Sequence, residues 1–484
     1  MKTLKEILAD INILEQYGPR VLDLSNIAFD SRQVRVNSMF AALVGTQVDG
    51  HEFIEKAIQN GAIAILCQEL PENKRDGISY IRVKNSNISF AKIASNFYNS
   101  PSKQLKLVGI TGTNGKTTIA SLLYSLYREF GYKTGLISTI ENRIEDQIID
   151  STHTTPDALQ INELLSRMVS EGVSYCFMEV SSHAIDQDRI EGLSFSGGVF
   201  SNISHDHLDY HKNFAGYISA KKKFFDGLPK NAFALTNLDD KRGQVMLQNT
   251  LATKYSYGLN GIADFSCKII ENQFDGLQLS IEHQSVWFKL IGKFNAYNLM
   301  AIYATAVLLG EDKLETLAKL SNLNSAEGRF EQIKTNTKLS IIIDYAHTPD
   351  ALQNVLETIA SIRTGNEQLI TVVGAGGNRD KTKRPIMAQI ACSKSDRLVL
   401  TSDNPRFEDP NTIIEEMKAG VDAVSARKVL CITNRTEAIK TAIALAKAGD
   451  IILIAGKGHE KYQAINGENI PFDEKKIIED ALMN

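Results

Sequence analysis

The strongest chemical signal in the sequence is a glycine-rich segment that ends in a lysine and two threonines, Gly112–Thr118. It lies between an apolar run, 105–110, and a stretch with helical periodicity, so we expect a strand, a loop and a helix. The backbone N–H groups of such a loop face phosphates, its lysine binds the β- and γ-phosphates, and the next threonine binds Mg²⁺. The full P-loop pattern has an earlier glycine where this chain has Ile110. We predict nucleotide binding; the alternative is a glycine-rich turn with a chance lysine.

Two further groups have the chemistry of metal ligands. Glu179 ends an apolar run, 175–180, that we expect to be a buried strand beside the P-loop strand, so its carboxylate is placed to reach a metal or a water. Residues 205–211 read His-Asp-His-Leu-Asp-Tyr-His, and such clusters suit hard or borderline metals. The competing interpretations are a strand-end carboxylate that caps a helix and a solvated polar loop.

Lys221 lies in a basic triplet but on an unusual face. In the helix expected over 214–225, the positions three and four residues away from Lys221 are all apolar or aromatic: Tyr217, Ile218, Phe224 and Phe225. Lys223, by contrast, is on the polar side of the same helix. A lysine on a buried face is costly unless its charge is paired or chemically altered, so Lys221 is a functional candidate.

A third group follows the strands of the last third of the chain. Arg379 and Arg406 come from adjacent strand-end loops, an arrangement suited to bidentate carboxylate binding, and Glu460 comes from a third loop. Each arginine alone is more often a surface residue. Together the three predict a site for a ligand that carries both carboxylate and ammonium groups, an amino acid.

The elements that position these residues predict an α/β fold with three domains: an N-terminal α/β domain over 1–102, a central P-loop domain with a mostly parallel sheet over 103–333, and a C-terminal Rossmann-like domain over 334–484. A turn cluster at 99–102 marks the first boundary. In the central part we expect a helix capped by Thr155 with Pro156 at its first position. Five strands in the last part, 339–345, 368–374, 397–402, 429–433 and 450–456, alternate with helices, one of which opens at Thr348-Pro349.

Composition narrows the class of protein. The chain has 43% hydrophobic and 23% charged residues, as globular proteins do. Its formal net charge of −4 argues against nucleic acid as a main partner. No apolar stretch approaches the ~18 residues of a membrane span, and the N-terminal segment 1–18 is predicted to be an amphipathic helix and no signal peptide. Five widely spaced cysteines favour reduced thiols in the cytoplasm and exclude a Cys-x-x-Cys metal cluster.

The motifs taken together resemble the Mur ligase family over essentially the whole chain. The segments that carry the resemblance are 30–34, 44–50, 112–118, 179–183, 205–211, 294–298, 328–331, 344–350 and 456–460. Asp403-Asn404-Pro405-Arg406 is similar to the form found in members that add meso-diaminopimelate, whereas lysine-adding members lack that arginine. The resemblance implies a cytoplasmic, monomeric ligase that uses ATP and Mg²⁺ to join diaminopimelate to a UDP-linked muramoyl dipeptide through an acyl phosphate, with small molecules as its partners.

The resemblance also implies roles for individual residues. The catalytic set would be Lys116, Glu179, His207 and Lys221, with one Mg²⁺ on Thr117 and a second on Glu179, His207 and a carbamylated Lys221. The ATP-binding set would be Gly112, Thr113, Asn114, Gly115, Lys116, Thr117, Thr118, Asn298, Arg329 and Asp344. The UDP-substrate set would be Phe29, Ser31, Thr46, Gln47, Val48, His153, Thr154, Thr155, Ser181, Gln187 and Arg189, where His153 stands in place of an asparagine of some relatives. The diaminopimelate set would be Arg379, Asp403, Asn404, Pro405, Arg406, Gly456 and Glu460.

Three alternatives stay open. A lysine-adding ligase of the same family is opposed by Arg406, and a folylpolyglutamate-type synthetase is opposed by the uridine-binding N-terminal segment. A P-loop protein that uses a nucleotide as a switch would have no need of an amino-acid domain. ATP hydrolysis that requires both cosubstrates would separate an enzyme from such a switch.

Overall fold

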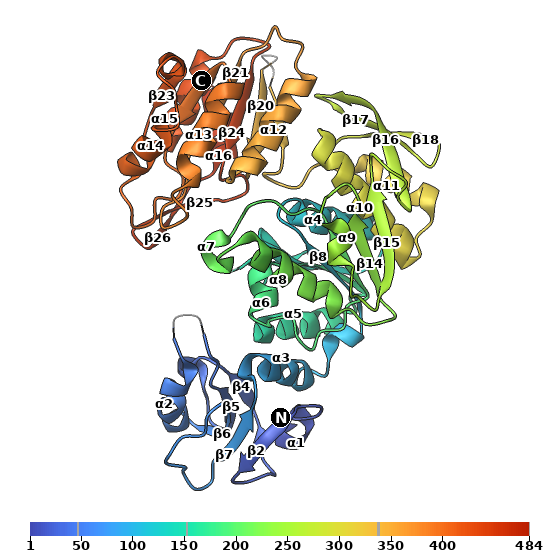
Figure 1. The fold of residues 1–484 in the computed structure, drawn as a ribbon, viewed down its shortest axis with the longest axis vertical. Coiled ribbons are helices and arrows are strands. Elements are labelled where there is room, and N and C mark those ends of the chain that lie inside the picture. The colour runs from blue at the N-terminus through green and yellow to red at the C-terminus, as the bar shows by residue number, and fades with distance from the viewer. Residues whose placement is uncertain (46–47, 152, 336–338, 484) are drawn as a thin grey trace.

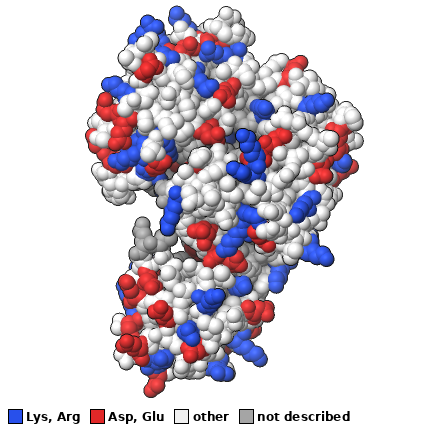
Figure 2. Space-filling view, viewed as in Figure 1, with Lys and Arg blue, Asp and Glu red and all other residues white. Residues whose placement is uncertain are grey.

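The computed structural model describes residues 1–45, 48–151, 153–335 and 339–483. Three separate main sheets follow one another along the long axis of the molecule (Figure 1). Lys and Arg side chains are interspersed with Asp and Glu over the face drawn in Figure 2. Within the described residues no helix is long and apolar enough to cross a membrane.

The N-terminal sheet has five strands in the order β2 (Ile13–Tyr17), β7 (Ser79–Val83), β6 (Ala62–Cys67), β5 (Ser38–Ala41) and β4 (Asn26–Ala28). All of its pairs are parallel except β2 with β7. Helices α2 (Ile54–Gln59) and α3 (Ser86–Phe97) complete this domain, and a short ladder joins β1 (Lys2–Thr3) to β3 (Asp23–Leu24).

The predicted N-terminal helix is wrong. Only α1 (Leu4–Ile7) is helical, and it begins with a capping box between Thr3 and Glu6. Asp10 then adopts a left-handed conformation with φ 61°, which stops the helix, and the next apolar residues pair with β7 as strand β2. Helical spacing over a short segment did not distinguish these two states.

The central sheet has eleven strands. Their order is β11 (Gln147–Asp150), β10 (Glu141–Ile144), β9 (Thr134–Ile137), β12 (Tyr175–Glu179), β8 (Lys106–Thr111), β13 (Gly197–Phe200), β14 (Phe233–Asn237), β15 (Thr253–Gly258), β16 (Phe265–Gln273), β17 (Gly276–Ile281) and β18 (Gln284–Phe288). The run from β9 to β16 is parallel, and the strands at both edges are antiparallel. The expectation of a mostly parallel sheet is confirmed.

Helices cover both faces of the central sheet. On β8, Val108 and Ile110 join the core that includes α4 (Lys116–Glu129) and α10 (Lys293–Leu309), while Leu107 joins the core that includes α5 (Ala158–Ser170) and α8 (Phe214–Asp226). The other helices here are α6 (Ser182–Asp186), α7 (Leu208–His211), α9 (Gly243–Met246) and α11 (Lys313–Asn322).

The start of α5 corrects a sequence prediction. The cap is Asp157, whose carboxylate accepts bonds from the N–H groups of Leu159 and Gln160. Thr155 instead donates its hydroxyl to the Glu179 carbonyl and accepts from the Ser181 N–H. The threonine ties two strand-end loops together, so the helix begins later than the sequence indicated.

The C-terminal sheet has the order β19 (Glu331–Lys334), β20 (Ser340–Asp344), β24 (Ile451–Ala455), β21 (Leu369–Val373), β22 (Arg397–Leu400) and β23 (Val429–Cys431). The five predicted strands are all present, and α12 (Pro349–Ile362) begins with Thr348 as cap and Pro349 at its first position, as expected. Other elements are α13 (Lys383–Lys394), α14 (Pro410–Lys418), α15 (Arg435–Leu445), the hairpin β25 (Tyr462–Ile465) and β26 (Glu468–Pro471), and α16 (Glu474–Met483). The predicted domain boundaries stay predictions; the second falls within β19.

All five cysteines are free thiols; Cys431 is exposed and the others are buried.

Candidate active site

A cleft of about 2080 Å³ lies where the central and C-terminal domains face each other. The loops that follow the carboxyl ends of β8, β12 and β13 line one side, and those that follow β20, β21, β22 and β24 line the other. In open parallel sheets this is the edge where ligands bind, and here two such edges share one space.

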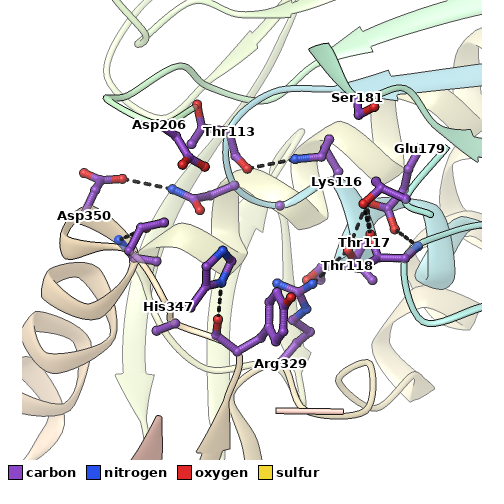
Figure 3. A pocket seen from close by; sticks show the side chains of 18 of the residues that line it. Thr113, Lys116, Thr117, Thr118, Glu179, Ser181, Asp206, Arg329, His347 and Asp350 are labelled. Atoms are coloured by element: carbon purple, nitrogen blue, oxygen red, sulfur yellow. Dashed lines mark hydrogen bonds between the residues drawn. The ribbon is translucent and has the colours of Figure 1, made fainter. Parts of the chain in front are cut away.

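The loop between β8 and α4 has the geometry of a phosphate cradle. Gly115 is the cap of α4 with φ 87°. A Cβ there would lie 2.5 Å from Oδ1 of Asn298, which is another residue of the predicted ATP-binding set. Only glycine allows both this backbone conformation and this close approach. Lys116 donates to the carbonyls of Gly112 and Thr113 at 3.0 and 2.9 Å (Figure 3). Burial lowers the pKa of Lys116, although Glu179 and Asp206 favour its charged form. An anion in the loop would therefore gain a pre-placed lysine.

Thr117 and Glu179 form the centre of a polar group beneath the loop. The Thr117 hydroxyl donates to Oε2 of Glu179 at 3.0 Å and accepts from Nη2 of Arg329 at 3.0 Å (Figure 3). The fully buried Glu179 carboxylate also accepts from the N–H and hydroxyl of Thr139, at 2.8 and 3.2 Å. The structure thus brings together a hydroxyl and a carboxylate beside the phosphate cradle.

Lys221 is buried, as its position on the helix predicts. The residue is 1% exposed, its Nζ lies 4.8 Å from the Tyr217 ring centre, and it donates to the Gly112 carbonyl at 2.8 Å. Burial lowers the pKa of Lys221 well below its ordinary value, and Lys116 lowers it further. Both effects shift the amine toward its uncharged, nucleophilic form.

His207 and its neighbours occupy the wall of the cleft next to Lys221. His207 caps α7 in a left-handed conformation with φ 53°, and its Nε2 lies 3.5 Å from Oδ2 of Asp206. Burial lowers the pKa of His207 to about 4, so its ring is neutral at pH 7. His347 faces the same region from the C-terminal domain; its Nδ1 donates to the Tyr345 carbonyl at 2.9 Å, which leaves Nε2 as an acceptor.

The loops after β22 and β24 are tied into one unit. Asn404 donates to Oε2 of Glu460 at 2.7 Å, and the buried Lys457 donates to both Asn404 and Glu460 at 2.9 Å. A Cβ at Gly456 would lie 2.5 Å from Oδ2 of Asp403, so these loops touch directly. Burial by itself raises the pKa of Asp403, but Lys457 and Arg435 outweigh it and hold the pKa below its ordinary value.

The two arginines predicted to read carboxylates converge on one glycine. A Cβ at Gly376 would lie 3.0 Å from Nη1 of Arg406 and 3.8 Å from Cγ of Arg379. Arg406 has φ 52° and donates through Nη1 to the Gly377 carbonyl at 2.9 Å. The separate loops of the sequence therefore bring both arginines to the same part of the cleft lining.

The residues predicted for the UDP substrate divide into two places. His153, Thr154, Thr155, Ser181 and Arg189 line the cleft, and Arg189 ties this group together through bonds to the Thr155 carbonyl and to Gln187. The described residues Phe29, Ser31 and Val48 belong to the N-terminal domain and do not line the cleft. Thr46 and Gln47 lie outside the described residues.

Comparison with known proteins gives the family. The profile "Mur ligase middle domain" matches residues 110–306, "Mur ligase, glutamate ligase domain" matches 328–458, and "Mur ligase family, catalytic domain" matches 23–98. The chain belongs to the Mur ligase family. It is therefore an enzyme, an ATP-dependent ligase.

The similarity to known proteins extends over nearly the whole chain. A protein of Cytophaga hutchinsonii is 56% identical over 480 residues, and one of Bacteroides thetaiotaomicron is 52% identical over 477 residues; each comparison covers 99% of both chains. Both relatives are named UDP-N-acetylmuramoyl-L-alanyl-D-glutamate–2,6-diaminopimelate ligase. A solved structure of that name is 32% identical with a TM-score of 0.70, covering 100% of this chain and 99% of the other.

A folylpolyglutamate synthase of Mycobacterium tuberculosis shares the fold alone. It is 17% identical with a TM-score of 0.63, and the match covers 76% of this ligase and 92% of that chain.

Sequence reasoning missed two residues that line the ligase's cleft, Asp350 and Thr139, and one buried residue behind it, Lys457. Asp350 accepts from Asn114 of the phosphate loop and from Ser204, both at 2.9 Å, and so connects the C-terminal domain to the central one (Figure 3). Thr139 holds Glu179, and Lys457 holds Asn404 and Glu460. Two of the three could have been found from their positions in the sequence. Asp350 follows the Thr-Pro pair that opens α12, and Lys457 lies in the loop that follows the end of β24.

Proposed function

We propose that this ligase joins meso-diaminopimelate to UDP-N-acetylmuramoyl-L-alanyl-D-glutamate in peptidoglycan precursor synthesis, with conversion of ATP to ADP and phosphate. The observation that carries the proposal is the shared cleft: the phosphate loop opens into it from one domain, and two arginines and a glutamate suited to an amino acid open into it from the other. The names of relatives that are 51–56% identical over almost the whole chain support the same assignment.

ATP is proposed to bind along the loop between β8 and α4. The backbone N–H groups of the loop and Lys116 would hold the β- and γ-phosphates, while Asn298, next to Gly115, would face the adenine. Arg329 already bonds to Thr117 and stacks on Tyr345, 4.6 Å from its ring centre, so it is anchored where it can stabilise charge on the transferring phosphate. Asp344, whose carboxylate accepts from the Phe330 N–H at 2.6 Å, would face the ribose.

The donor set beside the loop fits Mg²⁺. Thr117 and Glu179 offer oxygen ligands 3.0 Å apart, and among the described residues no three His, Cys, Asp or Glu side chains form a metal cage. This matches an ion that is bound by one or two carboxylates and otherwise by water and substrate phosphates. When bound, Mg²⁺ would neutralise charge on the phosphates. Thr117 and Glu179 would hold it, and Glu179 together with His207 and Lys221 would serve a second ion.

Lys221 is proposed to carry a carbamate. A neutral buried amine attacks the carbon of CO₂, and loss of the amine proton leaves an anionic carbamate in place of an unpaired ammonium. The carbamate would add a carboxylate-like ligand beside the phosphate loop, where the loop carbonyl of Gly112 now accepts from the amine.

The amino acid is proposed to lie between the arginines and Glu460. Arg379 and Arg406 would hold carboxylates, and Asp403, Asn404 and Glu460 would receive an ammonium group. The other amine would then point toward the phosphate loop. The UDP end of the second substrate would bind at Phe29, Ser31 and Val48, and its dipeptide would extend past Thr155, Ser181 and Arg189 into the cleft.

The reaction would proceed in two steps. The glutamate side-chain carboxylate attacks the γ-phosphorus of ATP, which forms an acyl phosphate and ADP. The diaminopimelate amine then attacks the acyl carbon, loses a proton and expels phosphate, which leaves the amide. Lys116 would stabilise the transferring group. We propose that the chain acts as a monomer in the cytoplasm; one chain supplies the residues of both halves of the cleft.

Phosphate release tests the proposal. Purified protein is mixed with ATP, Mg²⁺ and the UDP-dipeptide, and meso-diaminopimelate, lysine or no amino acid is added. We expect rapid release with diaminopimelate, slow release with lysine and almost none without an amino acid. Equal release with lysine would favour the lysine-adding alternative, and release that needs neither cosubstrate would favour a nucleotide switch.

A further inference from the structure

The largest fully buried side chains among the described residues are two arginines, Arg384 and Arg435. Both lie in the C-terminal domain, and both lie in the first turn of a helix, α13 and α15. A cation is unfavourable there, because the helix dipole places partial positive charge at the N-terminus. Neither residue lines the cleft.

Three loops, those that follow β21, β22 and β24, carry the residues proposed to bind the amino acid, and we call them the amino-acid loops. Arg435 connects the bases of two of them, the loops after β22 and β24. Its Nη2 donates to the carbonyl of Ala455 at 2.8 Å, and its Nη1 donates to that of Ser402 at 3.4 Å. These carbonyls directly precede Gly456 and Asp403, the first residue on each loop that is proposed to bind the amino acid. The Arg435 charge is balanced by Glu474 of α16 at 2.7 Å, and both side chains are fully buried.

Arg384 connects the loop after β21 to the loop after β22 in a similar way. Its Nη2 donates to the Gly376 carbonyl at 3.0 Å and to Oε1 of Glu408 at 3.0 Å. The same Glu408 oxygen accepts from the N–H of Asn378, next to Arg379, and Glu408 itself follows Arg406 by two residues. Arg384 therefore holds the loop of Arg379 against the loop of Arg406.

Stability alone is a poor reason for these pairs. Replacing a buried ion pair by apolar side chains of similar volume is often neutral or stabilising, because the charges lose their hydration. What apolar side chains lack is a directed set of donors: each guanidinium is planar and bonds to carbonyls of fixed position. Each arginine directs donors at two of these loops, and together they connect all three: Arg384 connects those after β21 and β22, and Arg435 connects those after β22 and β24.

We propose that Arg384 and Arg435 are positioning residues that hold the three amino-acid loops in the geometry that binds diaminopimelate. The proposal rests on the proposed function of those loops as the amino-acid site. It assigns α16 a part in substrate affinity, since Glu474 is the first residue of that helix and holds Arg435 in place.

The test replaces the buried pair by apolar residues. In the double variant Arg435→Met with Glu474→Leu, both members of the ion pair are removed and Lys457 still offsets the charge of Asp403, so we expect the thermal midpoint to stay close to that of wild type. The KM for diaminopimelate should rise about tenfold or more, because displacement of a positioned group by an ångström has effects of this size. The KM values for ATP and for the UDP-dipeptide should change less than about twofold.

A second variant and a matched control complete the experiment. Arg435→Lys keeps the charge opposite Glu474 but lacks the fork, so it should raise the same KM. Glu437→Gln with Lys440→Gln removes an exposed ion pair from the same helix and should leave every KM unchanged. Arg384→Lys should act as Arg435→Lys does.

The outcomes separate this proposal from the proposed function. Wild-type protein that releases no phosphate with diaminopimelate contradicts the proposed function. Active wild type with a folded Arg435 variant whose diaminopimelate KM is unchanged contradicts the positioning role alone. A parallel rise of all three KM values, or failure of both Arg435 variants to fold, shows that the pair serves the fold and also overturns the proposal.

Discussion

Replacement of Arg406 should lower activity with diaminopimelate far more than activity with lysine. The two amino acids differ by one carboxylate, and a guanidinium fork can hold that group by two parallel bonds. The backbone of Arg406 is held independently of its side chain, since its N–H donates to the Ala464 carbonyl at 2.9 Å and its carbonyl accepts from Asn466 at 2.7 Å. A side-chain replacement therefore leaves the loop in place.

The expected loss follows from the bonds removed. Hydrogen bonds to charged groups contribute about 1.5–3 kcal/mol each, so two of them amount to about 3–6 kcal/mol. At about 1.4 kcal/mol for each factor of ten, Arg406→Ala should lower kcat/KM for diaminopimelate by about 10²–10⁴. Alanine meets the same strain at φ 52° as arginine does, so the substitution adds no backbone penalty.

The assay is kcat/KM for diaminopimelate and for lysine in wild type, Arg406→Ala and Arg406→Lys. Lysine at 406 can still donate to the Gly377 carbonyl and keep the loops tied, but it cannot form the fork. We expect both variants to lose most of the preference for diaminopimelate while the KM for ATP stays nearly constant. An unchanged ratio between the two amino acids would refute the reasoning, because it would mean that Arg406 only ties the loops together.

Three further changes test the proposed ATP and Mg²⁺ sites. Lys116→Ala should fold normally but lose about 10²–10³ or more in kcat, since a charge on the transferring group is removed; near-normal turnover would exclude the phosphate-loop role. Lys221→Ala should be nearly inactive and partly rescued by short carboxylates, while Lys223→Ala, on the exposed side of α8, should stay active; full activity of Lys221→Ala without additive contradicts the carbamate. Burial raises the pKa of Asp344 to about 6, so between about pH 4 and pH 6 the folded state retains a proton that the unfolded chain has lost. As the pH rises through that window, the contribution of Asp344 to the free energy of unfolding therefore decreases. Asp344→Asn should therefore lose less thermal stability across that window than wild type; equal slopes would show that Asp344 does not titrate there.

Much of this protein could be predicted from the sequence because the relevant physics is local. The glycine-rich loop needs only a strand before it and a helix after it, and Thr348-Pro349 caps α12 through bonds to the next few residues. The burial of Lys221 follows from side chains one helical turn away, and the strands of the C-terminal sheet follow from apolar runs bounded by polar loops.

Local signals failed where a distant segment decided the outcome. The segment 1–18 has helical spacing, but pairing with β7 made its second half a strand. Thr155-Pro156 has the form of a helix start, but the threonine hydroxyl bonds to the strand end at Glu179, and Asp157 caps the helix instead.

The sequence by itself determined the phosphate loop, the strand-end carboxylate and arginines, and the family. Only the tertiary structure decided which of these groups meet. Asn114 and Asp350 lie 236 residues apart yet share a hydrogen bond, and Arg435 reaches the bases of two loops and Glu474 at once. The physical reason is that such contacts form when helices and sheets pack to bury their apolar faces, so the relative placement of two parallel-sheet edges depends on the whole set of cores and on no single segment.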